Sequence, residues 1–160
     1  MLLAVSGFGG GTDQLRPGDR LGGMRVITGT ATTADLKLFD VCDPVILASG
    51  RYTRRCGSVP RVSRLFVGYG QFELPGLINK TWKGSSWAAW LDGRRLVLPR
   101  FGTSDRTLVA FPPAGGRSVT LREWRVMLVK ASPGGHSLRY RFLDASGVID
   151  ATWVFAVSRR

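Results

Sequence analysis

The stretch HSLRYRF, residues 136–142, carries the clearest pattern in the sequence. Apolar Leu138, Tyr140 and Phe142 alternate there with polar Ser137, Arg139 and Arg141. A period of two is typical of a β-strand that has one face against a core and the other toward solvent. Turn residues follow at 144–147, and the apolar segment 148–157 completes a predicted antiparallel hairpin. We expect its core side chains to be Leu138, Tyr140, Phe142 and Val154.

Short apolar segments separated by turn residues continue this pattern toward the N-terminus. The clearest turn is Asp92-Gly93, because a two-residue hairpin turn needs positive φ at both positions. Residues 118–130 favour a strand, with a helix as the alternative. The 21 glycines and 8 prolines also favour short strands. The prediction is an all-β fold, a single antiparallel β-sandwich over 16–160, immunoglobulin-like or jelly-roll-like. Residues 1–15 would be a flexible N-terminal arm or the remnant of a signal peptide.

Two resemblances support this fold. The segment Pro133–Tyr140, the turn at 144–147 and the closing strand resemble the last hairpin of bacterial immunoglobulin-like domains, and residues 90–94 resemble an inner hairpin of such sandwiches. This resemblance implies a scaffold and brings no catalytic residues. More loosely, residues 18–140 resemble a group of secreted bacterial proteins, which implies export. The shared features are Cys56 before Val59-Pro60, Gly68-Tyr69-Gly70, Trp87 before Asp92-Gly93, Phe101-Gly102-Thr103, and Trp124 before Gly135-His136.

The positive charge of the chain is large and uneven. The net charge is +12; residues 1–50 hold four Lys or Arg and five Asp, a net of −1, so residues 51–160 hold +13. Such an asymmetry favours an anionic partner, and the alternative is a compositional bias toward arginine. Five arginines without an intervening acid form the candidate anion site: Arg51, Arg54, Arg55, Arg61 and Arg64. Guanidinium groups suit phosphate, sulfate and carboxylate groups, although charged residues on an edge strand also deter aggregation.

Three tryptophans are candidates for stacking against a sugar ring: Trp82, Trp87 and Trp90. Trp87 and Trp90 are an odd number of positions apart, so in a strand they lie on opposite faces. At least one of them is then exposed or covered by a loop. The alternative is that these rings anchor the core, as large aromatic side chains usually do.

The two cysteines predict a disulfide between Cys42 and Cys56, and two buried free thiols are the alternative. Their spacing and the remote single histidine, His136, argue against a metal site, and no motif indicates a cofactor. A Ser-His-Asp arrangement would have to use His136, and the G-x-S-x-G motif is missing from the sequence. We therefore expect no enzymatic activity. No apolar run reaches the ~18 residues of a membrane-spanning helix, and the predicted location is extracellular or at the cell surface.

These observations together predict an exported, non-catalytic binding module. Its basic face would bind an anionic partner such as an acidic glycan, a cell-surface polymer or nucleic acid, or else another protein. The first alternative is a self-assembling structural subunit of a surface layer, filament or capsid, which would form homo-oligomers. The second is a carbohydrate-binding module that uses its exposed tryptophans.

Overall fold

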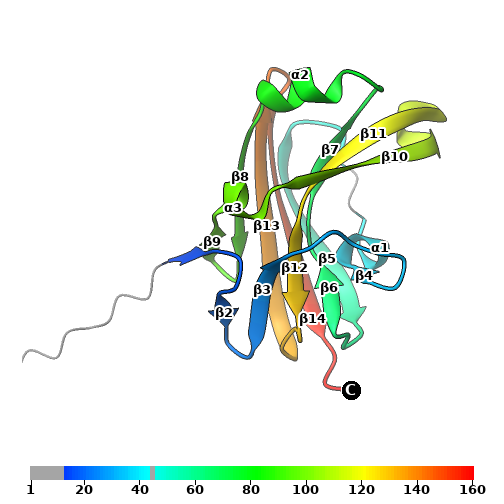
Figure 1. Ribbon diagram of the computed structural model, residues 1–160. Coiled ribbons are helices and arrows are strands. Elements are labelled where there is room, and N and C mark those ends of the chain that lie inside the picture. Colours follow the sequence, from blue (N-terminus) through cyan, green and yellow to red (C-terminus); the bar gives the residue numbers. More distant parts are fainter. Residues whose placement is uncertain (1–12, 44–45) are drawn as a thin grey trace, which may run out of the picture.

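The computed structural model describes residues 13–43 and 46–160. Strands dominate these residues and form three sheets, a six-stranded sheet in one layer with the other two sheets against it (Figure 1). The all-β sandwich expected from the sequence is confirmed. Residues 1–12 of the predicted N-terminal arm, 1–15, lie outside the described residues. Gln14–Leu15, near its end, forms the short strand β1.

The six-stranded sheet has the order β1-β9-β8-β13-β14-β5. The bounds of its other strands are β5 Gly50–Val59, β8 Ser86–Leu91, β9 Arg94–Leu96, β13 Gly134–Asp144 and β14 Gly147–Val157. The hairpin predicted from residues 136–157 is β13–β14, at the centre of this sheet. Asp92 and Gly93 join β8 to β9 with φ of 48° and 78°, as the predicted turn requires. Within the six-stranded sheet two of the strand pairings are parallel, β1 with β9 and β14 with β5.

The second layer contains a five-stranded sheet, β2-β3-β12-β6-β4, and a three-stranded sheet, β10-β11-β7. The bounds in the first are β2 Arg20–Leu21, β3 Met24–Thr28, β4 Leu36–Lys37, β6 Arg64–Phe66 and β12 Val126–Val129. In the second they are β7 Gly70–Glu73, β10 Thr103–Phe111 and β11 Arg117–Trp124. The segment 118–130 is thus extended, as expected, but it is divided at Arg125 between two sheets. The pair β6–β12 continues across this break as the pair β7–β11.

Helices are few and short. They are α1 Leu38–Val41, α2 Ile78–Lys83, α3 Leu98–Phe101 and the 3₁₀ turn η1 Pro112–Ala114. Helix α2 lies beside the three-stranded sheet, where the Arg122 side chain packs over the Trp82 ring (Figure 1). No helix in the described ranges is long and apolar enough to cross a membrane.

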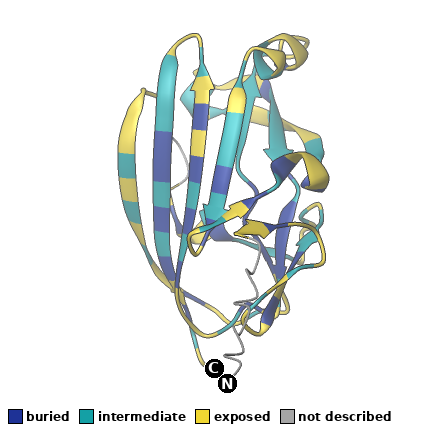
Figure 2. Ribbon diagram, turned by 90° about the vertical axis from the view of Figure 1, so that its left-hand side faces the viewer, coloured by how far each residue is buried: buried dark blue, intermediate teal, exposed yellow. Residues whose placement is uncertain are grey.

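The core lies between the two layers. Leu138, Tyr140 and Phe142 are buried, as predicted, and alternate with less buried residues along β13 (Figure 2). The prediction for Val154 is wrong: it is only partly buried. It pairs with Ser137, and side chains of directly paired residues share a face, so both lie on the outer face of the sheet. The inward positions of β14 are instead Trp153, Phe155 and Val157.

Candidate functional site

A pocket of about 350 Å³ lies between the three-stranded sheet and the six-stranded sheet. It exists because the hairpin β10–β11 projects away from the rest of the second layer instead of lying flat on the first (Figure 1). The inner faces of the two sheets are therefore not fully packed against each other there. Ligand pockets in proteins have volumes of about 300–1,000 Å³, so the cavity has room for a small molecule.

The three-stranded sheet provides one wall of the pocket. Strand alternation points every second side chain inward, so Arg106 and Leu108 of β10 lie beside Leu121 and Glu123 of β11. Phe72 of β7 extends this wall. Its ring contacts the Phe111 ring edge to face, with 4.8 Å between the ring centroids. The wall is thus apolar except for one ion pair.

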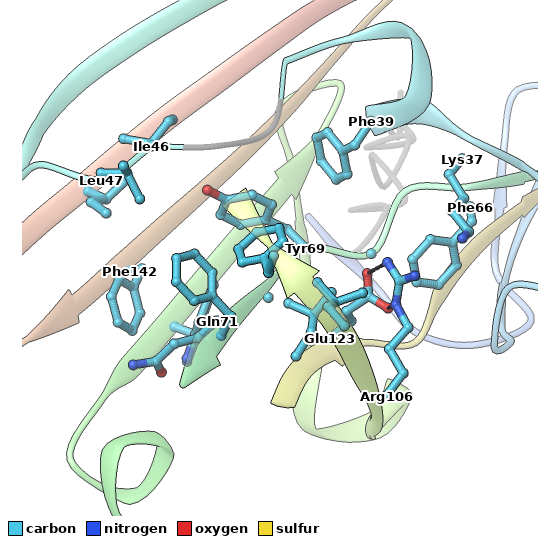
Figure 3. A pocket seen from close by; sticks show the side chains of 18 of the residues that line it. Lys37, Phe39, Ile46, Leu47, Phe66, Tyr69, Gln71, Arg106, Glu123 and Phe142 are labelled. Carbon is cyan, nitrogen blue, oxygen red and sulfur yellow. Dashed lines mark hydrogen bonds and ion pairs between the residues drawn. The ribbon is translucent and has the colours of Figure 1, made fainter. Parts of the chain in front are cut away.

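The six-stranded sheet and the chain before β5 provide the other wall. Trp87 of β8 and Phe142 of β13 contact each other with ring centroids 4.5 Å apart. The remaining apolar lining comes from Phe39, Ile46, Leu47, Phe66, Tyr69 and Ile149. Figure 3 shows these side chains around the cavity. Leu47 is 67% exposed, which is unusual for a leucine and places part of the apolar lining in contact with solvent.

Polar groups in the pocket are few. Arg106 donates to Glu123 from Nε (3.1 Å) and from Nη2 (3.4 Å), as the dashed lines of Figure 3 mark. The Glu123 side chain is 13% exposed and that of Arg106 is 44% exposed. Burial raises the pKa of Tyr69 above its ordinary value, so its hydroxyl stays neutral. Lys37, Asp40, Gln71, Asp144 and Ser146 complete the polar lining.

The predicted stacking residues separate. Trp87 lies in the pocket wall, and Trp82 of α2 stacks on it with ring centroids 5.1 Å apart. Trp90 lies on the outer face of the six-stranded sheet, where the Arg139 guanidinium covers its ring at 4.7 Å. Trp87 and Trp90 thus lie on opposite faces, as their odd spacing predicts. The three rings do not form one platform.

The five predicted arginines also separate. Arg51, Arg54 and Arg55 belong to the edge strand β5, where alternation directs Arg54 to the opposite face from the other two. Arg61 follows β5, and Arg64 begins β6 in the other layer. Three of the five have a carboxylate within 4.0 Å: the ion pairs are Arg51–Asp150, Arg54–Asp43 and Arg64–Asp35. These pairs reduce the charge that the arginines present to a partner.

The disulfide between Cys42 and Cys56 is confirmed. It joins the residue after α1 to the middle of β5, so it holds the segment that carries Ile46 and Leu47 against the six-stranded sheet. Closing a loop of this length contributes about 3 kcal/mol to stability in the chain-entropy model. The disulfide thus supports one side of the pocket mouth.

Asp92, His136 and Ser132 lie in a row that resembles a catalytic triad. His136 Nδ1 is 2.7 Å from Asp92 Oδ2, and its Nε2 is 2.7 Å from the Ser132 carbonyl oxygen and 3.4 Å from Ser132 Oγ. A carbonyl oxygen only accepts hydrogen bonds, so Nε2 carries a proton and cannot take one from the serine. Asp92 Oδ1 also accepts from the backbone N–H of Ser137. The row therefore ties the β8–β9 turn to β13 and does not activate a nucleophile.

His136 makes stability depend on pH. The hydrogen bond to Asp92, and after it the contact with the Ser132 carbonyl, raises the pKa of His136 against the opposing effect of burial. When folding raises the pKa of a histidine, protonation stabilises the folded state. This stabilisation is complete at pH values below the pKa of the unfolded chain, about 6.5, and it is lost as pH rises through the pKa of the folded protein. We therefore expect the melting temperature to fall as pH rises above about 6.5, and His136→Gln to remove that part of the slope. The chain has one histidine, so thermal melts of the two proteins from pH 6 to pH 9 measure its contribution. Equal slopes would contradict the assignment.

No group of three or more His, Cys, Asp or Glu side chains in the described part of the chain is placed to hold a metal ion. Of the three carboxylates that line the pocket, Glu123 is engaged by Arg106. What the pocket provides is apolar contact area with a few polar groups.

No protein-family model matches this sequence, and no curated protein matches it. Similar solved structures include the cysteine protease inhibitor EhICP2 from Entamoeba histolytica (11% identity, 77% of this chain and 93% of that chain, TM-score 0.33), PbICP-C in complex with falcipain-2 (12%, 78% and 98%, 0.37) and amebosin (12%, 78% and 96%, 0.31). One of these three is described as a cysteine protease inhibitor, and one is described in complex with falcipain-2.

The function expected from the sequence, an exported module that binds an anionic partner through a basic face, is wrong. Of the similar structures named above, one is described as a cysteine protease inhibitor and one as a complex with falcipain-2, and none of the three as a binder of an anionic polymer. The same correction applies to its alternatives, the structural subunit and the carbohydrate-binding module. The geometry agrees with the correction, since the arginines and the tryptophans are each dispersed over different faces. A homo-oligomeric state stays a prediction.

The sequence analysis missed the pocket, apart from Trp87. A signal was present in β11, where Val119 and Leu121 alternate with polar residues and so require an apolar neighbour on one face. That pattern indicates a covered face but not what covers it.

Proposed function

We propose that this protein binds an apolar small molecule in the pocket between its two layers, without acting on it chemically. The observation that carries the proposal is the cavity of about 350 Å³, lined by aromatic and aliphatic side chains from both sheets. Protein interiors are otherwise packed as densely as organic crystals, so an unfilled apolar space of this size forfeits stability. A ligand that fills the space recovers those contacts.

The construction of the pocket supports a binding role. Its two walls belong to different sheets, and each sheet is held in place by contacts outside the cavity. Tyr140 donates from its hydroxyl to the Val67 carbonyl (3.1 Å) across the layers, and Arg122 binds Asp105 and Asn79 behind the three-stranded sheet. A pocket held open in this way needs little rearrangement to accept a ligand.

We also propose that the protein works outside the cytosol. The support is the Cys42–Cys56 disulfide, because structural disulfides persist mainly in oxidising compartments. The bacterial origin implied by the resemblance of the last hairpin belongs to the same proposal.

Filling the pocket tests the binding proposal. Leu121→Trp adds a large ring to the partly exposed lining of β11, whereas Leu143→Trp adds the same ring at an exposed position of β13 outside the pocket. Calorimetric titration with naphthalene-1-methanol, a neutral apolar probe, should show binding to the natural sequence. We expect affinity to fall at least about tenfold in Leu121→Trp and to change less than about twofold in Leu143→Trp. Absence of binding to the natural sequence, or equal loss in both variants, would refute the proposal.

A further inference from the structure

The charge inside the pocket has the opposite sign to the charge of the protein. Five charged side chains line the cavity: Lys37, Asp40, Arg106, Glu123 and Asp144. Two are cations and three are anions, so the lining has a net charge of −1 in a chain whose net charge is +12. The pocket is therefore an acidic recess in a basic protein, a combination that attracts cations locally and repels them elsewhere.

Glu123 is the more buried partner of the ion pair that it forms with Arg106. Its side chain is 13% exposed, and Arg106 approaches it from a much more exposed position. Each carboxylate oxygen accepts one N–H from Arg106, at 3.1 Å and 3.4 Å. A carboxylate offers about four acceptor sites on its two oxygens, so Glu123 can accept further hydrogen bonds from a ligand.

The aromatic rings favour the same kind of ligand. Phe39, Tyr69, Trp87 and Phe142 line the cavity, and the faces of such rings attract organic cations. Figure 3 places Phe39, Tyr69 and Phe142 on one side of the cavity and the Glu123–Arg106 pair on the other. An ammonium group could thus meet Glu123 while its apolar body lies among the rings.

We propose that the ligand of this pocket is an organic amine in its ammonium form, with an apolar or aromatic body. The inference rests on the proposed function and specifies its ligand class. Lys37 and Arg106 are the groups that would hold an anion instead. Arg106 is already paired with Glu123, and Lys37 is outnumbered by the two remaining carboxylates, Asp40 and Asp144, so an anionic ligand is disfavoured.

Three probes with one naphthalene body and different head groups test the proposal: 1-naphthylmethylamine, naphthalene-1-methanol and 1-naphthoate. Titration calorimetry of the full chain at pH 7 and low salt should rank the amine at least about tenfold tighter than the alcohol, with the carboxylate weakest. Glu123→Gln should weaken the amine about tenfold and leave the alcohol unchanged. Glu73→Gln removes the same charge from β7 outside the pocket lining and should change the amine less than about twofold.

The outcomes separate the two proposals. Equal affinities for the three probes, or tightest binding of the carboxylate, would overturn the amine as ligand while the pocket stays a binding site. Binding of none of them would overturn both. If Glu123→Gln does not fold, the ranking of the three probes on the natural sequence still decides the ligand class, because the three differ only in their head group.

Discussion

Replacement of Gly70 by alanine is expected to lower the free energy of unfolding by about 3 kcal/mol or more. A Cβ on Gly70 would lie 1.9 Å from the Arg122 carbonyl oxygen, and a Cβ on Gly68 would lie equally close to the Trp124 carbonyl oxygen. Both neighbours are backbone atoms of the paired strands, so no side-chain rotation relieves the clash. Overpacking typically lowers the free energy of unfolding by about 1–3 kcal/mol where side chains can adjust. A clash with the backbone is expected to cost at least the upper value of that range.

The matched control is Gly57→Ala in β5, where an added Cβ meets no atom within 4 Å. We expect the free energy of unfolding of this variant to change by less than about 0.5 kcal/mol. Urea unfolding followed by circular dichroism measures both variants. A Gly70→Ala protein as stable as the control would mean that β7 and β11 do not approach each other at Gly70 as closely as described.

Trp153→Ala should have the second large effect, a loss of about 3–5 kcal/mol in the free energy of unfolding. Trp153 is fully buried, its ring centroid lies 4.9 Å from those of Phe39 and Tyr69, and its Nε1 donates to the Asp43 carbonyl. The substitution removes these contacts and leaves a cavity directly behind the pocket wall. We therefore expect weaker binding of naphthalene-1-methanol together with the lost stability.

Trp90→Ala provides the comparison for the same residue type. Trp90 lies on the outer face and contacts the Arg139 guanidinium, so its removal should cost about 1 kcal/mol or less. Unfolding of both variants should be followed by far-ultraviolet circular dichroism, since tryptophan fluorescence changes with the substitution itself. Similar losses for the two variants would contradict the assignment of Trp153 to the core.

The parts of the fold that depend on neighbouring residues could be predicted from the sequence. Alternation predicted the faces of β13, and Asp92-Gly93 predicted the turn between β8 and β9, because few residues adopt positive φ twice in succession. The spacing of Cys42 and Cys56 also allowed the disulfide to be expected. The residues that determine each of these features lie within about fifteen positions of one another in the sequence.

The parts that depend on distant residues could not be predicted. Nothing near Arg125 indicates that one extended segment serves two sheets, because the change of direction is imposed by the strands on either side of it. The ion pairs join Arg51 to Asp150 and Arg64 to Asp35, residues that are 99 and 29 positions apart in the sequence. The pocket depends on the angle between two sheets, and a hydrophobic pattern specifies which face is covered but not how far away its cover lies.

The parallel pairing of β5 with β14 also determines when the chain can complete its fold. Arg51 pairs with Asp150, and on the other layer Val26 pairs with Leu128, so both layers join strands about 100 positions apart. Contacts of such long sequence separation slow folding to the millisecond-to-second range, because the loop entropy is lost before the contacts form. During synthesis β3 and β5 are made before β12 and β14, so their edges stay unpaired until about 100 further residues have been added. A chaperone that keeps these early strand edges apart is therefore expected to raise the yield of folded protein.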